Sequence, residues 1–289
     1  LHVSPAEAQT PTIWYADADA TGARTGQSWQ DAFTDLQAAL AAAAPHDEIW
    51  VAEGIYTPSP GTDRTVSFKM KGGVALYGGF GGTETHREER DWSLHPTVLS
   101  GDIDGNDSTD PHGVIIDTAN IMGANSYHVV TSTGVTETAV LDGFIITGGK
   151  AEEGVPIPYG GGMVNENSSP TLSNVTFRGN AAGEGGGMAN DNSSPMLTHV
   201  TFHSNSAYAG DRFGGGMANY NSSSPTLAHV TFRDNTATYG GGMYNVSSDP
   251  RLIHVTFRGN TATYGGGMAN YSDSNPTLTN VTFRGNVAR

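Results

Sequence analysis

Residues 160–182, which read GGGMVNENSSPTLSNVTFRGNAA, decide the fold, because the chain contains close variants of them four more times up to residue 288. The methionines of the five copies recur about every 25 residues, with one longer interval between the second and the third: Met163, Met188, Met217, Met243 and Met268. Repeats of this length are typical of solenoids, in which each unit buries its apolar face only against its neighbours. The sequence therefore predicts a stack of similar coils.

Each unit predicts three short extended segments separated by turns. In residues 174–178, alternation places Val175 and Phe177 on one face of a strand. The same alternation places Asn174, Thr176 and Arg178 on the opposite face. Stacking the coils about 4.8 Å apart aligns equivalent residues. We therefore expect interior columns of Met, Leu, Val and Phe, and exposed columns of polar residues.

Two columns of asparagine are expected at corners of the coil. One runs from Asn165 to Asn270 after the methionine, and the other runs from Asn180 to Asn286 after the phenylalanine. A side-chain amide can bond the backbone of the next coil, and asparagine tolerates the left-handed turn conformation. The repeat also begins before its glycines, because residues 141–151 align with residues 172–182.

The N-terminal part of the chain is irregular. Apolar residues recur at helical spacing between Ser28 and Ala44, and Ser28 with Asp31 forms a capping pair, so we expect one helix there. Short apolar runs at 49–52, 74–80, 97–101, 127–131 and 139–149 predict strands. We therefore expect one domain over 13–289, with a capping helix and irregular coils over 13–135 and regular coils over 136–289.

The composition of the chain argues against some classes of partner. The chain has 29 acidic and 14 basic residues and a net charge of −15, which argues against nucleic acid and against an anionic membrane surface as partners. It has no cysteine, which excludes a disulfide framework and thiol zinc sites. No apolar run reaches the roughly 20 residues of a membrane helix, so we expect no membrane insertion by this segment. Residues 1–12 are interpreted as a signal-peptide remnant or a disordered N-terminus, because Ala-Glu-Ala at 6–8 fits a cleavage site. The pattern breaks off at residue 289, where another glycine run is expected, so we expect a truncated C-terminus.

These motifs resemble right-handed parallel β-helix (pectin-lyase-like) repeat proteins of bacteria. The paired GGGM and Phe-x-x-Asn signatures are similar to the repeats of chlamydial polymorphic outer-membrane proteins, and WYADADATG at 14–22 and LYGGFGGTE at 76–84 are similar to the capping region of secreted β-helix proteins. The resemblance implies an all-β, right-handed parallel β-helix, a solenoid with about 25 residues per coil. It also implies a secreted, extracellular or cell-surface location. It implies no single activity, because the fold carries lyases, hydrolases and adhesins.

Outward side chains form the candidate binding stripe. Arg suits carboxylate or sulfate groups, and Tyr rings can stack on sugars, so the stripe predicts a polysaccharide or cell-surface glycan as partner. An ordinary solvated sheet face, with tyrosines stacking only on one another, is the alternative. The candidate residues are His199, His229, His254, Arg178, Arg233, Arg258, Arg284, Tyr239 and Tyr264.

The loop at 101–110, GDIDGNDSTD, is a candidate calcium site. Its oxygen-bearing side chains Asp102, Asp104, Asn106 and Asp110 are the hard ligands that Ca²⁺ prefers. A solvated acidic turn is the other interpretation, because no glutamate closes the loop as in an EF-hand. No other cofactor is expected.

Catalytic residues stay unassigned. Acidic residues of the coils fall at different repeat positions, and the least implausible cluster joins Asp234 with Arg233 and Asp211. Three functions therefore remain open. The first is a non-catalytic, adhesin-like or glycan-binding scaffold, the second a polysaccharide lyase or glycoside hydrolase, and the third a structural protein that assembles end to end through exposed strand edges.

Overall fold

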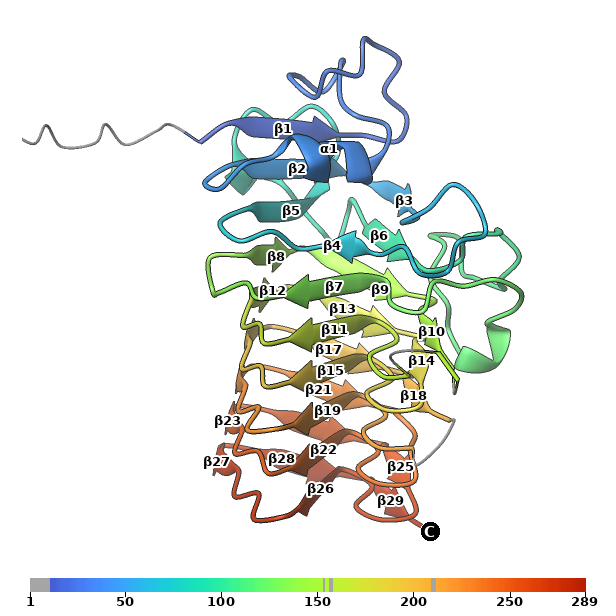
Figure 1. Cartoon of the computed structure of the whole chain (residues 1–289), viewed down its shortest axis with the longest axis vertical. Helices are drawn as coiled ribbons and strands as arrows, with labels where there is room; N and C mark the ends of the chain where they lie inside the picture. The colour runs from blue at the N-terminus through green and yellow to red at the C-terminus, as the bar shows by residue number, and fades with distance from the viewer. Residues whose placement is uncertain (1–10, 153, 156–157, 209–211) are drawn as a thin grey trace, which may run out of the picture.

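The structure is a computed structural model that describes residues 11–152, 154–155, 158–208 and 212–289. It is a parallel β-solenoid of about eight turns with about 29 residues per turn. Figure 1 shows the coils stacked along one axis, with the N-terminal coils and helix α1 (Leu36–Ala42) at one end and the C-terminus at the other. The shorter period expected from the methionines describes only the most regular coils, because insertions lengthen the others.

Three parallel sheets run the length of the stack. Sheet A contains β1 (Ile13–Ala16), β2 (Glu48–Ala52), β5 (Ala75–Phe80), β8 (Val140–Asp142), β12 (Thr171–Ser173), β16 (Met196–Thr198), β20 (Thr226–Ala228), β23 (Arg251–Ile253) and β27 (Thr277–Thr279). Sheet B contains β3 (Gly54–Tyr56), β6 (Thr97–Ser100), β9 (Phe144–Thr147), β13 (Thr176–Arg178), β17 (Thr201–His203), β21 (Thr231–Arg233), β24 (Thr256–Arg258) and β28 (Thr282–Arg284). Sheet C contains β4 (Phe68–Lys69), β7 (Val130–Thr133), β11 (Met163–Glu166), β15 (Met188–Asp191), β19 (Met217–Tyr220), β22 (Met243–Val246) and β26 (Met268–Tyr271).

Shorter elements complete the coils. Two-residue strands follow sheet B at one corner: β10 (Lys150–Ala151), β14 (Ala181–Ala182), β18 (Ser206–Ala207), β25 (Thr261–Ala262) and β29 (Val287–Ala288). Short 3-10 helices η1 (Arg87–Glu89) and η2 (Thr118–Asn120) lie in the long loops that follow β5 and β6. The loop after β6 projects from the stack on the side of β10 and β14 (Figure 1), whereas η1 lies against sheet A, where Arg87 pairs with Glu48 of β2.

The interior consists of the expected apolar columns. Phe177, Phe202, Phe232 and Phe257 are fully buried, and successive rings stack at 4.7–4.9 Å with interplanar angles of 4–6°. The expected alignment of residues 141–151 with 172–182 is confirmed, because Leu141 pairs with Leu172 and Ala151 with Ala182. Stacking identical rings packs this column closely.

Both asparagine columns are buried, but only one lies at a corner. In the Asn180 column, the Oδ1 atom of Asn205 accepts from the Asn180 backbone N–H, and its Nδ2 donates to the Phe177 carbonyl. The corner expected for the Asn165 column is wrong. Asn165 lies inside strand β11, and its amide donates to the amide oxygen of Asn190 at 2.7 Å. On its other side, the Asn165 amide oxygen accepts from the Ser132 hydroxyl of the preceding coil.

The capping helix is shorter than expected. It begins after Asp35, whose carboxylate accepts from the Gln37 backbone N–H, and not at Ser28. The pair Ser28 and Asp31 instead forms a separate turn, in which the Asp31 carboxylate also accepts from the Ala23 backbone N–H. Phe33 then bridges to β1, which prevents the helix from starting earlier.

Candidate functional site

A groove follows the outer face of sheet B. Its floor is the threonine column Thr176, Thr201, Thr231 and Thr256, whose members pair in register from coil to coil and are half-buried. A cavity of about 470 Å³ over these threonines is also lined by Arg233 and Arg258. A second cavity of about 360 Å³ shares Thr176 and continues past Ile145 to Trp92. We call the two cavities together the sheet B groove.

His199 lines one side of the groove, and His229 and His254 occupy the same position in the next two coils, but none of the three is a strand residue. His199, His229 and His254 have φ of 55°, 57° and 54°, so each occupies a left-handed corner just before its strand. The expectation that the strand alternation includes them is therefore wrong, because the chain turns between this position and the next. Their exposed rings stack at 5.1 and 5.0 Å. Because the three rings stack one above the other, they do not converge on a single metal ion.

The arginines line the other side of the groove. Arg178, Arg233, Arg258 and Arg284 end strands β13, β21, β24 and β28, and His203 takes this position in β17. Burial lowers the pKa of Arg233, and the like charges of Arg178 and Arg258 lower it further, while Asp234 opposes them. Cations one strand spacing apart repel one another, so an anion that lies across them relieves the repulsion.

His203 is the neutral member of the arginine column. Burial, followed by the charges of Arg233 and Arg178, lowers the pKa of His203 to about 4, although Asp234 lies 3.6 Å from its Nε2 atom. The imidazole is therefore uncharged at neutral pH. The Nδ1 atom of His203 and the Nε atom of Arg178 are both buried and make no hydrogen bond. Two unsatisfied polar atoms thus lie side by side in one column.

Trp92, which the sequence reasoning missed, lies at the N-terminal end of the groove. Its neighbour Arg90 forms an ion pair with Asp142 at 2.9 Å and lies 5.1 Å from the Trp92 ring centroid. Asp142 also accepts from Asn174, the first residue of the corner column that continues with the histidines. Trp92 belongs to no repeat, so the sequence pattern could not place it. Its position depends on the ion pair between Arg90 and Asp142, which lie far apart in the sequence.

Tyr239 and Tyr264 do not belong to this groove. They bridge to each other in the segment just before the glycines that lead into sheet C, and their rings stack at 4.9 Å. Tyr239 also contacts Tyr271 of β26 at 5.7 Å. The expectation of one stripe that contains both tyrosines and arginines is therefore wrong, because a coil turns through a corner between these positions.

The candidate calcium loop uses its oxygens internally. Asp102 accepts from the backbone N–H groups of Gly105, Asn106 and Asp107. Asp104 accepts from the Asn106 side chain, and Asp110 from the His112 backbone N–H, with its other oxygen 4.0 Å from Arg178. Across the described ranges, no three His, Asp or Glu side chains gather as a metal site. Calcium binding stays a prediction.

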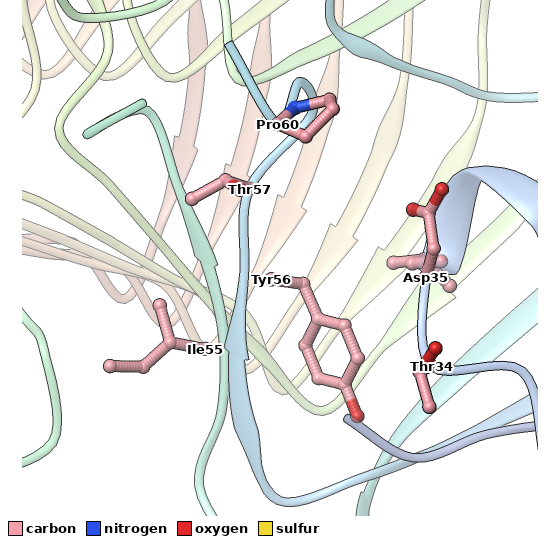
Figure 2. A pocket seen from close by; sticks show the side chains of 7 residues that line it. Thr34, Asp35, Ile55, Tyr56, Thr57 and Pro60 are labelled. Carbon is pink, nitrogen blue, oxygen red and sulfur yellow. The ribbon is translucent and has the colours of Figure 1, made fainter. Parts of the chain in front are cut away.

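Another pocket lies at the capped end. Figure 2 shows it between the start of α1 and strand β3, with Tyr56 projecting between the two segments. The cavity has a volume of about 240 Å³. Its polar groups already serve the fold, because Asp35 caps α1 and the Tyr56 hydroxyl donates to the Ala52 carbonyl. The sheet B groove is therefore the better candidate.

Two further expectations concern catalysis and membranes. Of the proposed cluster, Asp234 and Arg233 lie together in the groove, whereas Asp211 lies outside the described residues. In the described part of the chain, no helix is both long enough and apolar enough to cross a bilayer.

Comparison with known proteins identifies the family. No curated protein matches the chain. A pectate lyase crystal structure superposes with a TM-score of 0.55 at 16% identity, covering 87% of this chain and 55% of that one. The chain thus spans about half of that lyase, and the likeness concerns the fold alone. The family model described as "Right handed beta helix region" matches residues 103–288. The chain therefore belongs to the right-handed β-helix family.

Proposed function

We propose that this protein binds an anionic polysaccharide in the sheet B groove and acts as a non-catalytic scaffold, secreted or displayed at the surface of a bacterial cell. The proposal depends on one observation. On a chain with a net charge of −15, the groove presents Arg233 and Arg258 in register beside a floor of threonine hydroxyls. Guanidinium groups bond carboxylates and sulfates in two-pronged geometry, and hydroxyls bond those of a sugar.

The periodicity of the groove favours a polymer over a small anion. Equivalent residues recur at the spacing of adjacent strands, about 4.8 Å, along the axis. A chain that carries a negative group on each sugar can therefore contact several coils at once, and each added contact raises the effective concentration for the next. Solenoid proteins commonly bind through extended surfaces of this kind.

Binding to polygalacturonate, alginate and heparin tests the proposal. Replacing both Arg233 and Arg258 with Ala is expected to weaken binding by about tenfold or more, because charge-assisted hydrogen bonds are lost. Affinity electrophoresis in gels that contain each polymer measures the effect. Retardation by none of the three polymers refutes the proposal.

Arg251→Ala is the matched control for Arg258→Ala. Both arginines are exposed and lie in the same coil, but Arg251 begins β23 of sheet A and Arg258 ends β24 of sheet B. The net charge changes equally in both variants. Equal loss of binding in both indicates attraction to overall charge and not to the groove.

A polysaccharide lyase is the second candidate, and His203 is the observation that favours it. Its imidazole lies in the column between Arg178 and Arg233, and a uronate carboxylate held by these arginines would oppose the charges that lower the imidazole pKa, so that the ring could take up a proton from the sugar. Incubation with polygalacturonate or alginate and measurement of ultraviolet absorbance from unsaturated products tests this function. Product formation that disappears in His203→Gln favours the lyase, whereas retained binding without product favours the scaffold.

A further inference from the structure

The sheet B groove is closed at one end. Thr176 pairs with Ile145 of β9, and Ile145 pairs with Val98 of β6, so the three occupy one outward column. Thr176 and Ile145 are half-buried, but Val98 is only 1% exposed. Its neighbour Leu99 belongs to the main core, whereas Val98 does not. Val98 therefore faces outward and is covered, and a chain lying along the threonines cannot continue across β6.

The segment that carries Trp92 forms one wall at this closed end. Its backbone lies directly on strand β5, because Asp91 N–H donates to the Gly79 carbonyl at 2.8 Å. A Cβ atom on Gly79 would lie 2.7 Å from the Trp92 nitrogen, so only glycine allows this approach. Arg90 of the same segment forms an ion pair with Asp142 at the end of β8, and both side chains are largely buried, so this contact fixes the segment to the next coil. The wall is thus rigid, while the Trp92 side chain itself is 41% exposed.

The loop around Ile115 forms the opposite wall. Ile115 N–H donates to the Thr147 hydroxyl at the end of β9, at 3.1 Å. A Cβ atom on Gly179, which follows β13, would lie 2.6 Å from the Ile115 carbonyl oxygen. Asp110 of the same loop lies 4.0 Å from Arg178. The coil that contains β9 therefore has a wall on each side, whereas Thr201, Thr231 and Thr256 line an open channel.

We propose that the sheet B groove takes the end of an anionic glycan chain, with the terminal sugar against Trp92 and the following sugars along the threonine and arginine columns. This inference rests on the proposed function and adds to it the part of the polymer that is bound. A sugar presents a face of C–H groups that packs on an indole, while its remaining hydroxyls bond polar neighbours. Ser93, Asn174 and His199 line the same cavity and supply those polar neighbours.

The experiment uses galacturonate hexamers in three forms: unmodified, with a bulky fluorophore on the reducing end, and with the same fluorophore on the non-reducing end. Calorimetry with the wild-type chain is expected to show about tenfold weaker binding for one blocked form and unchanged binding for the other. The weakened form identifies which end enters. Equal affinity for all three forms overturns the inference, because an open groove accepts internal sugars.

Trp92→Ala connects this preference to the closed end of the groove. The variant is expected to bind the unmodified hexamer about tenfold more weakly and no better than the blocked form, and Trp92→Phe is expected to recover part of the loss. Unchanged affinity in Trp92→Ala also overturns the inference. If the wild-type chain binds no hexamer but is retarded by one of the three polymers, only the chain-end inference fails, and if none of the polymers retards it, the proposed function fails as well. If it binds all forms equally, only the chain-end inference fails.

Discussion

The regular coils and the irregular N-terminal coils are held together by different means. In the regular coils, each buried asparagine bonds its counterparts above and below, as Asn205 does with Asn180 and Asn235. In the N-terminal coils each polar contact is unique, for example Asp47 accepting from the Thr12 and Ala44 backbones and from the Trp14 indole. Repetition gives a straight, periodic surface, and irregularity supplies the loops that end it. The sheet B groove needs both.

Asn235→Ala is expected to have the largest effect on stability. The Asn235 amide accepts from the backbone and side chain of Asn205 and donates to the Phe202 carbonyl and to Asn260. Its removal leaves several buried groups without partners, at a cost of about 4 kcal/mol. Urea unfolding followed by circular dichroism measures this loss. A loss below about 1 kcal/mol would show that water replaces the ladder.

Asp47→Ala tests the irregular end in the same assay. Loss of three hydrogen bonds to a charged acceptor is expected to cost about 3 kcal/mol. Because Asp47 lies in the cap, the damage is expected to concentrate there. Hydrogen exchange should increase over β1 and α1 and remain unchanged over β21 and β24. An equal increase in hydrogen exchange along the whole chain would contradict the view that the two regions are stabilised by different contacts.

His203 predicts how stability depends on pH. Its pKa is about 4 in the folded chain, below the value of about 6.5 for an unfolded chain, so the unfolded state binds the proton more readily. Stability is therefore fully present above about pH 6.5 and decreases as pH falls towards about 4, by at most about 3 kcal/mol. His203→Gln should remove this part of the pH dependence. Parallel curves for both proteins would show that other groups cause it.

Asp234→Gly is expected to have the smallest effect and to act on binding. Asp234 occupies a left-handed corner with φ of 57°, where the neighbouring coil has Gly259, so the change restores the commoner residue of the repeat. It also removes a carboxylate from the groove. Affinity for anionic glycans should rise by about two- to threefold at low salt, and less at high salt. Weaker binding would indicate that Asp234 contacts the ligand.

The sequence predicts the regular coils better than the irregular N-terminal coils. The Phe177 and Asn180 columns are predictable, because every coil repeats both the residue and its partners. The corner position of His199 is not, because alternation alone cannot show where φ becomes positive. Trp92 could not be placed at all, since its surroundings come from Asp142 and Asn174, which lie far along the chain. The arginine side of the groove was thus foreseeable, whereas its histidine corner and its closed end were not.

The asparagine ladder of sheet C gives the solenoid a row of amide dipoles that are aligned along its axis. Each side-chain N–H donates to the amide oxygen of the next coil, from Asn165 to Asn190, then to Asn219, Asn245 and Asn270. The amide dipoles therefore point the same way and polarise one another. Rotating one amide by half a turn would break the bonds on both sides of it. The orientation of each amide is consequently fixed by the orientation of its neighbours along the ladder.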